Sequence, residues 1–335
     1  MSKRRMLNRK QKIVLVLTLL SGALLAVLSL SASFVRSIPK SQLAAERWSE
    51  TGGYAQVSVF YTEDAKADRT RFERFEETLE ASYAEEGIKA EEGRELWISA
   101  ASGEGTVFLE SDRARMSVNA VGVIGEFFLF HPQKLLYGSL ISGDSRRTDG
   151  IVIDEEIAWQ LFGSSDVAGM EVMIGGVPHF ISGVIERQCD AMEKKAGADE
   201  ATVYLSYESL STYGYTPGIT CYEILLPNPV SGYGKTLVEK GLGAGGSRAE
   251  LVENSGRYSV ESLFRVVKAF GARSMKTTKM SYPTWENAAR GWEDVLAVLL
   301  IWQSVCVAVL LLIGVALCVA GYRWIERAVR QWRRE

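Results

Sequence analysis

Hydrophobic residues concentrate in two long runs, one near each end of the 335-residue chain. Ile13–Val35 is apolar apart from one threonine, a few serines and a glycine, and Val295–Gly321 is interrupted by Gln303, Ser304 and two glycines. A helix of roughly 20 such residues crosses the hydrocarbon core of a bilayer. The pattern therefore predicts two transmembrane helices, at 13–35 and 295–321, with a domain of mixed composition between them at 36–294.

Lysine and arginine flank both runs. Residues 1–12 hold six of them and no acidic residue, and residues 322–335 hold five arginines against two glutamates. Because basic residues collect on the cytoplasmic side of membrane helices, both tails are expected in the cytoplasm and the middle domain outside. The expected location is the cell (cytoplasmic) membrane, with two passes, and the basic tails are expected to contact anionic lipid headgroups.

A cleaved signal peptide is the alternative interpretation of the first run. The basic start and the small residues at 29–33 fit it, whereas the length of the run favours a membrane span. Cleavage would leave a single-span protein with the same outward domain.

Composition limits the choice of partners and chemistry. The formal net charge is −3, and since the basic residues gather at the two ends, the outer domain is acidic, which argues against nucleic acid as a partner. Its length fits two subdomains. Cys189 and Cys221 lie in the outer domain, where either a disulfide or two separate thiols is allowed, and nothing in their spacing decides. Cys306 and Cys318 are expected to pack within the second span.

The first part of the outer domain predicts a β-α-β unit. Ile38–Thr51 is expected to continue the first span as a helical stalk. Tyr54–Tyr61 is rich in residues that favour strands, Thr70–Glu86 has helical periodicity, and Glu95–Ala100 predicts a second strand. The apolar side of the helix consists of Phe72, Phe75, Leu79 and Tyr83.

Shorter elements are expected along the rest of the domain. They are two strand-like runs within Gly105–Val123, an aromatic turn or short helix at Gly125–Pro132, a strand at Gly150–Ile153, a helix at Glu155–Phe162 capped by Asp154 and ended by Gly163, and a hairpin of Met170–Ile174 and His179–Ile185. They continue with a loop or linker at 187–200, strands at Val203–Leu205 and Ile219–Leu226, a helix at Gly234–Lys240, a flexible loop at Gly241–Ser247, an amphipathic helix at Val260–Phe270 and a helical approach to the second span at Trp285–Asp294.

An ordered series of short motifs resembles the extracytoplasmic (periplasmic) core domain of MacB-type ABC transporter permeases. The motifs are VGVIGEFF at 121–128, Gly138, IVIDEEIAWQLFG at 151–163, Asp166, Gly169, VMIGGVPHFISGVIE at 172–186 and VYLSYESL at 203–210. With the flanking spans and the β-α-β unit, the resemblance covers roughly residues 13–320.

The resemblance implies an α+β outer domain between two transmembrane α-helices. A ferredoxin-like porter subdomain, at about 50–104 and 201–280, would carry an inserted β-rich subdomain at 105–200. In the family, a cytoplasmic ABC ATPase moves the helices beneath the outer domain. Family permeases have four spans, and here the last two are missing, so a divergent short subunit or a permease relative without ATPase coupling is expected.

Two glycine-containing motifs resemble nucleotide-binding loops. GYGKT at 232–236 resembles the end of a P-loop, but Pro229 stands where that loop needs a glycine with a free N–H. GLGAGGS at 241–247 follows a predicted helix, whereas a dinucleotide fingerprint follows a strand. Turns and loops are the favoured interpretation of both.

The remaining polar candidates favour structural roles. His131 is expected in a turn and His179 in a partly exposed strand, and two histidines without matching cysteines predict no zinc site. Asp154, Glu155 and Glu156 favour a helix cap with first-turn acids over a metal or acid–base role. Gln303 and Ser304, like the small-residue pairs Gly22/Ala26 and Gly314/Cys318, are explained by packing between the two spans or by assembly with another subunit. No catalytic, cofactor-binding or metal-binding residue is predicted, and no cofactor.

The sequence therefore predicts a non-catalytic, ABC-transporter-permease-like membrane subunit that couples transmembrane helix movement to the outer domain. Expected partners are a cytoplasmic ABC ATPase or another permease subunit, the lipid bilayer and a second copy of the chain. The alternative is a stand-alone surface binding or sensing protein with a cleft between its subdomains, and a hydrolase is a third class without a visible nucleophile. Segments 38–51 and 285–294 are expected side by side, so that cysteines near Leu43 and Ala288 crosslink.

Overall fold

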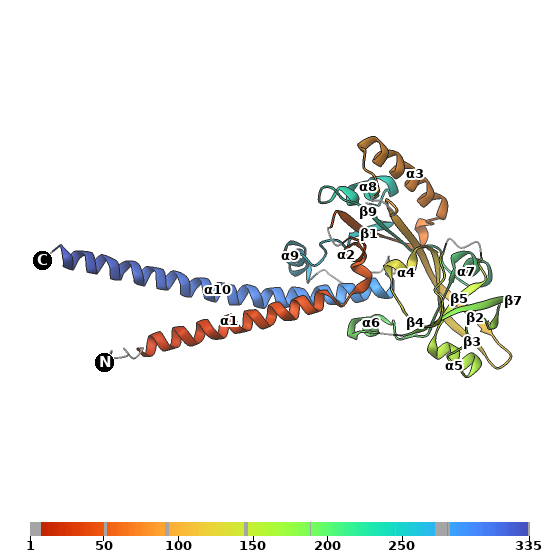
Figure 1. Cartoon of the computed structure of the whole chain (residues 1–335), viewed down its shortest axis with the longest axis horizontal. Helices are drawn as coiled ribbons and strands as arrows, with labels where there is room; N and C mark the ends of the chain where they lie inside the picture. Colours follow the sequence, from red (N-terminus) through yellow and green to blue (C-terminus); the bar gives the residue numbers. More distant parts are fainter. Residues whose placement is uncertain are drawn as a thin grey trace. The chain divides into compact units, whose positions relative to one another are not determined.

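The computed structural model describes residues 8–49, 52–90, 94–143, 147–187, 189–244, 246–271, 280 and 282–333 (Figure 1). They divide into two compact units. The helical unit comprises Met1–Ser37, Tyr258–Gly271 and Glu293–Glu335, and the sheet unit comprises Ile38–Arg257 and Ala272–Trp292.

The helical unit contains α1 (Arg9–Arg36), α9 (Val260–Ala269) and the greater part of α10 (Thr284–Trp332). Both α1 and α10 are long and apolar enough to cross a membrane. Leu263 of α9, Ala32 of α1, and Leu296 and Leu300 of α10 are buried in one cluster. The amide of Gln303 donates a hydrogen bond of 3.4 Å to the Ser29 hydroxyl, so this polar residue of the second apolar run contacts the first.

The expected helical stalk at Ile38–Thr51 is wrong. Helix α1 ends at Arg36, and two separate short helices follow, η1 (Lys40–Gln42) and α2 (Ala44–Trp48). The break lies at Pro39, which has no N–H to donate and disfavours helical torsions at Ile38. The chain therefore turns here instead of extending the span.

Four strands of the sheet unit have the ferredoxin-like order β10-β1-β9-β2, and each neighbouring pair is antiparallel. Two β-α-β repeats build this part: β1, α3, β2 and then β9, α8, β10. Their bounds are Tyr54–Tyr61 for β1, Arg69–Glu86 for α3, Ile98–Glu110 for β2, Cys221–Pro227 for β9, Tyr233–Leu242 for α8 and Ala249–Glu253 for β10; a short turn of helix, η2 (Glu63–Ala65), follows β1.

Helices α3 and α8 cover one face of these strands (Figure 1). The predicted apolar side of α3 is confirmed, since all four of its residues are buried there. Asp68 caps the helix by accepting from the Arg71 amide, and Gly87 ends it in the left-handed region. This face is a conventional apolar core.

The segment between β2 and β9 extends the sheet through β3, β8, β5, β7 and β4, and β6 pairs with β2 and β7. Parallel pairs (β3 with β8, β5 with β7) stand beside antiparallel ones, so the sheet is mixed. The bounds are Arg115–Gly125 for β3, Phe127–Phe130 for α4, Lys134–Gly138 for β4, Gly150–Asp154 for β5, Glu155–Phe162 for α5, Glu171–Ile174 for β6, Val177–Glu186 for β7, Ala191–Ala196 for α6, Thr202–Ser206 for β8 and Tyr207–Tyr213 for α7.

The predicted fold class is thus confirmed: a mixed α+β domain with an apolar helix at each end of the chain. The subdomain boundaries at about 104 and 200 stay a proposal. Strand β2 crosses the first of them without a break, and it pairs with both β9 and β3.

Strand β2 joins two segments that were expected as separate strands, Glu95–Ala100 and the first strand-like run within Gly105–Val123. A Cβ atom added to Gly105 would lie 2.0 Å from the carbonyl oxygen of Tyr215, and one added to Gly103 would lie 2.4 Å from that of Gly218. The glycines therefore serve close approach of the 215–218 segment to a continuous strand, and they do not mark a turn.

The expected loop at 187–200 contains helix α6. The Asp190 carboxylate accepts from the Met192 and Glu193 amides, Glu193 accepts from the Asp190 amide, and Gly197 ends the helix in the left-handed region. This is a capping box in a short, strongly charged segment whose composition hid it.

Candidate functional site

The second face of the ferredoxin-like strands carries buried polar side chains beside apolar ones such as Phe60 and Leu225, and we call it the polar face. Alternate residues of β1 and β9 point to it, among them Gln56, Ser58 and Glu223, each at most 2% exposed. A buried polar group without a partner costs stability. Gln56 finds its partners in the segment that follows α1, whereas Ser58 and Glu223 bond to each other and to Asn254 and His131.

Gln56 fixes the segment that follows α1. Its side-chain oxygen accepts from the Ala44 amide at 2.9 Å, and its nitrogen donates to the Ser41 carbonyl at 2.6 Å. Arg47 on α2 donates to the carbonyl oxygens of Leu129 (2.7 Å) and Phe130 (3.2 Å) at the end of α4. Burial lowers the pKa of Arg47. The segment η1–α2 is thereby attached to both the sheet and α4.

Glu286 fixes the start of α10 in the same way. Its carboxylate is 1% exposed and receives a bidentate pair from Arg257, at 2.7 and 2.8 Å, and a third bond from Arg290 Nε at 2.7 Å. Burial raises the pKa of Glu286, but the two guanidinium groups outweigh it and hold the pKa below its usual value. Fork-shaped arginine pairs of this kind are strong and fix orientation.

Arg290 extends the contact to strand β10. Its Nη2 donates to Glu250 at 2.6 Å, and its guanidinium carbon lies 3.8 Å from the ring centroid of Tyr282. The Tyr282 hydroxyl donates to the same Glu250, and burial together with this bond raises the pKa of Tyr282 to about 12. The pKa of Arg290 is raised above its usual value because Glu286 and Glu250 outweigh its burial.

A chain of hydrogen bonds joins these ion pairs to α4. Ser58 donates to Glu223 at 2.9 Å and accepts from Asn254 at 2.8 Å, and the Asn254 oxygen accepts from Arg257 at 3.1 Å. The other Glu223 oxygen contacts Nε2 of His131, at the end of α4. His131 was expected in a turn; it is buried, with ring centroids 4.5 Å from Phe127 and 4.3 Å from Trp285.

Helix α6 holds the opposite side of α10. Trp292 Nε1 donates to the Asp190 carboxylate at 3.0 Å. A Cβ atom added to Gly291 would lie 2.9 Å from the sulfur of Met192, so α6 packs closely against the helix at this point. We call Glu286, Arg290 and Trp292, with their partners Arg257, Glu250 and Asp190, the α10 anchor.

Glu104 of strand β2 lies at the first turn of α10. The backbone of Thr284 hydrogen-bonds to its carboxylate. Burial raises the pKa of Glu104 to about 7, and the bond to Thr284 opposes that shift. A negative charge here suits the positive end of the helix dipole, but removal from water works against ionisation.

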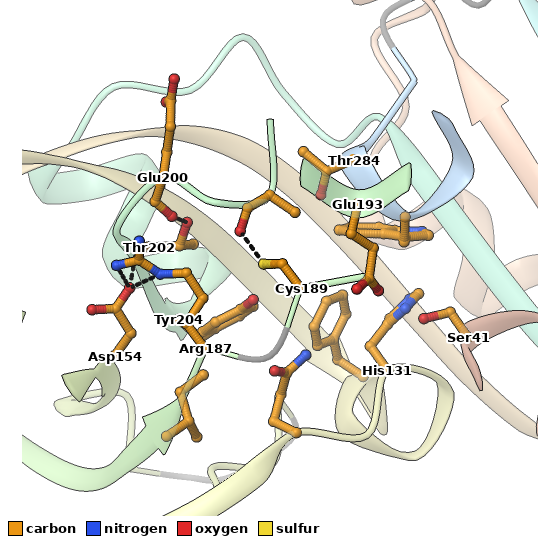
Figure 2. A pocket seen from close by; sticks show the side chains of 15 residues that line it. Ser41, His131, Asp154, Arg187, Cys189, Glu193, Glu200, Thr202, Tyr204 and Thr284 are labelled. Carbon is orange, nitrogen blue, oxygen red and sulfur yellow. Dashed lines mark hydrogen bonds and ion pairs between the residues drawn. The ribbon is translucent and has the colours of Figure 1, made fainter. Parts of the chain in front are cut away.

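A groove opens beside the α10 anchor (Figure 2). Side chains from η1, α4, β7, α6, β8 and the start of α10 line it, including Ser41, His131, Glu193 and Tyr204. It adjoins a hollow of about 330 Å³ that Glu104 and Asn119 also line. Among the described residues, neither His131 Nδ1 nor Trp285 Nε1 has a hydrogen-bond partner, and both residues border the groove.

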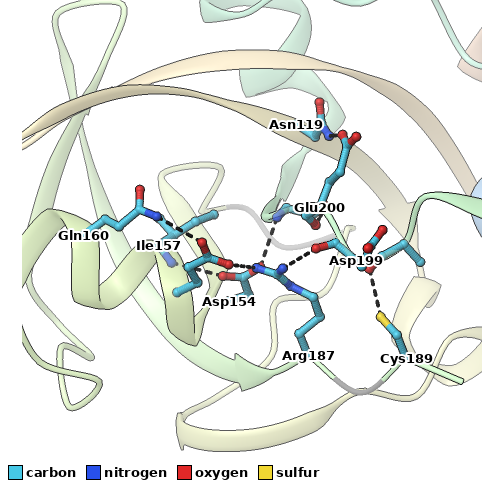
Figure 3. Close-up of polar contacts among 11 residues, drawn as sticks. Asn119, Asp154, Ile157, Gln160, Arg187, Cys189, Asp199 and Glu200 are labelled. Atoms are coloured by element: carbon cyan, nitrogen blue, oxygen red, sulfur yellow. Dashed lines mark hydrogen bonds and ion pairs between the residues drawn. The ribbon is translucent and has the colours of Figure 1, made fainter. Parts of the chain in front are cut away.

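Arg187 organises one wall of the groove (Figure 3). It donates to the Asp154 carboxylate at 2.6 and 3.0 Å and to Glu156 at 2.8 Å. Asp154 also caps α5 through the Ile157 amide at 3.0 Å, as its position predicted. Burial lowers the pKa of Arg187, but the two carboxylates outweigh it and raise the pKa above its usual value. The acidic cluster is therefore a cap joined to an ion pair that sequence reasoning missed.

The two nucleotide-loop resemblances lie away from this site. In GYGKT, Gly232 adopts φ +83°, the Gly234 amide donates to Asn228 at 3.1 Å, and the Thr236 amide donates to the Gly232 carbonyl at 3.0 Å. These amides serve the turn that starts α8. GLGAGGS is described except for residue 245, and its first two residues belong to α8.

The remaining candidates are dispersed. His179 was expected to be partly exposed, which is wrong, because it is 1% exposed. Helix α7, which was not predicted, places the Tyr213 ring against it, with the two ring centroids 5.5 Å apart. Cys189 and Cys221 are free thiols. Cys189 donates to the Ala198 carbonyl in the groove, and Cys221 is buried beside Phe60. Within the described ranges, no three His, Cys, Asp or Glu side chains are arranged to hold a metal ion.

Comparison with solved structures gives similar domains at low identity. The periplasmic region of MacB from Actinobacillus actinomycetemcomitans is 13% identical, with a TM-score of 0.42 over 65% of this chain and 94% of that one. The extracellular domain of the noncanonic ABC-type transporter YknZ from Gram-positive bacteria is 13% identical, with a TM-score of 0.37 over 59% of this chain and 99% of that one. A domain of a putative permease protein from Porphyromonas gingivalis is 14% identical, with a TM-score of 0.34 over 60% of this chain and 89% of that one.

No curated protein matches the sequence. The family model for the MacB-like periplasmic core domain matches residues 13–231, which is more than half of the chain and includes the whole series of permease-like motifs from 121 to 210. The chain therefore belongs to the family of MacB-like periplasmic core domains.

Proposed function

We propose that the chain is a non-catalytic, ABC-transporter-permease-like membrane subunit in which α10 carries movement between the membrane and the outer domain. Family membership supports a permease-like extracytoplasmic domain flanked by two apolar helices. The observation that carries the coupling role is the α10 anchor. Three residues within the first turns of one long helix are bound to the sheet on one side and to α6 on the other.

The anchor is suited to transmitting force because breaking it is costly. Glu286 and Arg257 are almost fully buried, and separating them would leave uncompensated charges in a medium of low dielectric constant. A surface ion pair would yield instead, since it is worth at most about 1 kcal/mol. Movement of α10 would then displace the sheet rather than slide past it.

The same proposal includes the membrane placement and the partners. Both termini would lie in the cytoplasm, as the basic tails favour. A cytoplasmic ABC ATPase or another permease subunit would supply the energy, and a second copy of the chain is a further partner. Purification of the full chain from its native membrane in mild detergent tests this. Co-purification of an ATPase or a full-length permease is expected, and repeated failure to find either would contradict the proposal.

The coupling itself can be tested in nanodiscs with the co-purified ATPase. Spin labels at Arg74 on α3 and Val319 on α10 are expected to change their separation when ATP is added. Joint replacement of Arg257, Glu286 and Arg290 by Met should preserve folding, because apolar side chains of similar volume often replace buried ion pairs without loss of stability. This variant should lose the ATP-dependent change, whereas Arg69→Gln with Glu73→Gln, an exposed pair, should keep it. A full response in the triple variant would exclude the anchor as the coupling element.

A second candidate function is a stand-alone surface binding protein, and the groove favours it. It joins Trp285, at the start of α10, to residues of the segment between β2 and β9, such as Tyr204, and it leaves His131 Nδ1 and Trp285 Nε1 without partners among the described residues. Native mass spectrometry of the detergent-extracted protein would reveal a retained ligand. Tyr204→Ala should release it and Tyr137→Ala, on the exposed strand β4, should not. A chain without any retained ligand but with a bound ATPase would favour the transporter role.

A further inference from the structure

Helix α9 is more strongly amphipathic than its contacts within the chain require. Its apolar side consists of Val260, Leu263, Phe264, Val266 and Val267, followed by Phe270, and its other side carries Glu261, Ser262, Arg265 and Lys268. Such a helix buries its apolar side against something. What covers that side can be followed residue by residue.

Among the residues that the structure describes, one edge of the apolar side is covered and the other is exposed. Leu263 and Val266 are 1% and 8% exposed, and Leu263 belongs to the buried cluster of the helical unit. Val260 and Phe264 are 52% and 47% exposed. Exposed valine and phenylalanine side by side on one helix form an apolar surface that the described chain leaves open to its surroundings.

The covered edge marks the level at which α9 lies. Ala32 is near the end of the first apolar run, and Leu296 and Leu300 are in the first turns of the second. Both belong to the ends of the runs that adjoin the outer domain. Helix α9 therefore lies beside the two helices where their apolar surfaces begin, which in a bilayer is the boundary between headgroups and acyl chains.

At the level of α9, the two helices expose large apolar side chains. On α1, Leu30 and Phe34 are 73% and 70% exposed, and on α10, Val298 and Ile301 are 46% and 40% exposed. Leu30, Phe34 and Val298 stand two residues from members of the shared cluster, so they lie on the sides of the helices that turn away from it. The medium that covers these sides surrounds both helices at the level where α9 exposes Val260 and Phe264.

We propose that α9 is an interfacial helix, which lies in the outer surface of the bilayer with Val260 and Phe264 inserted among the acyl chains. Lys268 borders the apolar side next to Phe264, where its ammonium group reaches phosphate while its aliphatic stem stays in apolar surroundings. The lipid is therefore the partner of this surface. The helix adds a third membrane contact on the side of the outer domain, and this inference rests on the proposed membrane placement of α1 and α10.

Spin labels at single cysteines test the proposal in the full chain. The four native cysteines are replaced by Ala, and one label is placed at Val260, Phe264, Glu261 or Leu312. The protein is reconstituted in vesicles of phosphatidylethanolamine and phosphatidylglycerol. Collision with oxygen, which dissolves in acyl chains, is compared with collision with a water-soluble nickel chelate. Labels at Val260 and Phe264 are expected to favour oxygen at shallow depth, and the label at Glu261, one residue from Val260, is expected to favour nickel.

Leu312 separates this inference from the membrane placement itself, because it lies in the middle of the second apolar run and is 71% exposed. A deep label at Leu312 with a nickel-accessible label at Phe264 would overturn the interfacial helix and leave the two spans intact. Protection of Phe264 from both reagents would show that a protein surface covers it, which also overturns the proposal. A nickel-accessible Leu312 would refute the membrane placement and the interfacial helix with it.

Discussion

The two faces of the ferredoxin-like strands are both buried, yet they are built from different chemistry. Toward α3 and α8, the strands present Val57, Val59 and Ile224 to an apolar core. Toward the start of α10, the same strands present the buried polar residues Gln56, Ser58 and Glu223, with apolar residues such as Phe60 and Leu225 beside them. The apolar contacts of the first face have no preferred direction, so they tolerate small shifts of the helices that cover it. The second face specifies which atoms meet, through bonds such as those of Gln56 to the Ala44 amide and of Ser58 to Glu223.

The difference indicates that one face of the sheet stabilises the fold and the other holds segments in position. A helix that only stabilises needs apolar contact, which supplies most of the free energy of folding. A segment that must hold one position under load gains from hydrogen-bonded ion pairs, which fix orientation and leave uncompensated buried charges when they separate. Both segments that lead toward the apolar helices of the chain attach to the polar face, through Gln56 and through Glu286.

Loss of Glu286 should be the largest single effect on the polar face. Glu286→Ala is expected to lower the free energy of unfolding by about 3–5 kcal/mol, because it removes the carboxylate that buried Arg257 faces. Urea unfolding of the full chain in detergent, followed by tryptophan fluorescence, measures it. Glu73→Ala, in the exposed pair with Arg69, should cost at most about 1 kcal/mol. Similar losses in the two variants would contradict a buried anchor.

On the apolar face, Leu79→Ala should be costly for stability but not for coupling. A cavity beneath α3 is expected to cost about 3 kcal/mol. Because Leu79 belongs to the cluster beneath α3 and is not a member of the α10 anchor, the ATP-dependent change in spin-label separation should survive below the unfolding temperature. Glu80→Ala, on the exposed side of the same helix, serves as the control. A coupling defect in Leu79→Ala as large as that of the Met triple variant would remove the distinction between the faces.

The pH dependence of stability should reveal Glu104. Its folded pKa, about 7, lies above its ordinary value of 4.5, so its folded form prefers the proton. The cost of ionising it is absent below pH 4.5 and grows as pH rises to 7, so wild-type stability should fall over that window relative to Glu104→Gln. Unfolding temperatures of both proteins from pH 4 to 8 give the difference curve, in which the titration of shared groups cancels. A flat difference would show that Glu104 is not held away from water.

The smallest effect compares two helix caps. Asp68→Ala at α3 and Asp190→Ala at α6 should each cost about 1 kcal/mol. Only the Asp190 variant also removes the bond to Trp292, so it alone should weaken the ATP-dependent change in spin-label separation. Equal coupling in the two variants would show that α6 does not contribute to holding α10.

Local signals in the sequence predicted one face of the sheet and not the other. The periodicity of Phe72, Phe75, Leu79 and Tyr83 identifies a helix and its buried side without reference to any distant residue. Polar residues alternating along β1 look the same whether they face water or a buried partner. The partner of Ser58 stands 165 residues away, at Glu223, and no pattern within β1 records it.

Some of the missed features did leave a signal. Asp190 and Glu193 have the spacing of a capping box and Gly197 follows at the end position, so α6 was open to detection. Glu286 and Arg290 stand four residues apart on one helix, which marks a pair but not its burial. The expected crosslink between Leu43 and Ala288 stays a prediction, with the qualification that the first of these residues lies between two short helices instead of within a stalk.

The position of β1 between β9 and β10 has a consequence for how the protein is made. Ser58 of β1 aligns with Glu223 of β9 and with Val252 of β10. Both strands that pair with β1 therefore come much later in the chain than β1 itself. A chain that emerges from its amino end would place α1 first and expose β1 while some 165 further residues are still to follow. Closure of such long loops is slow, and an unpaired strand edge invites association with other chains. The biogenesis of this protein therefore depends on keeping β1 from pairing with other chains until β9 and β10 have been synthesised.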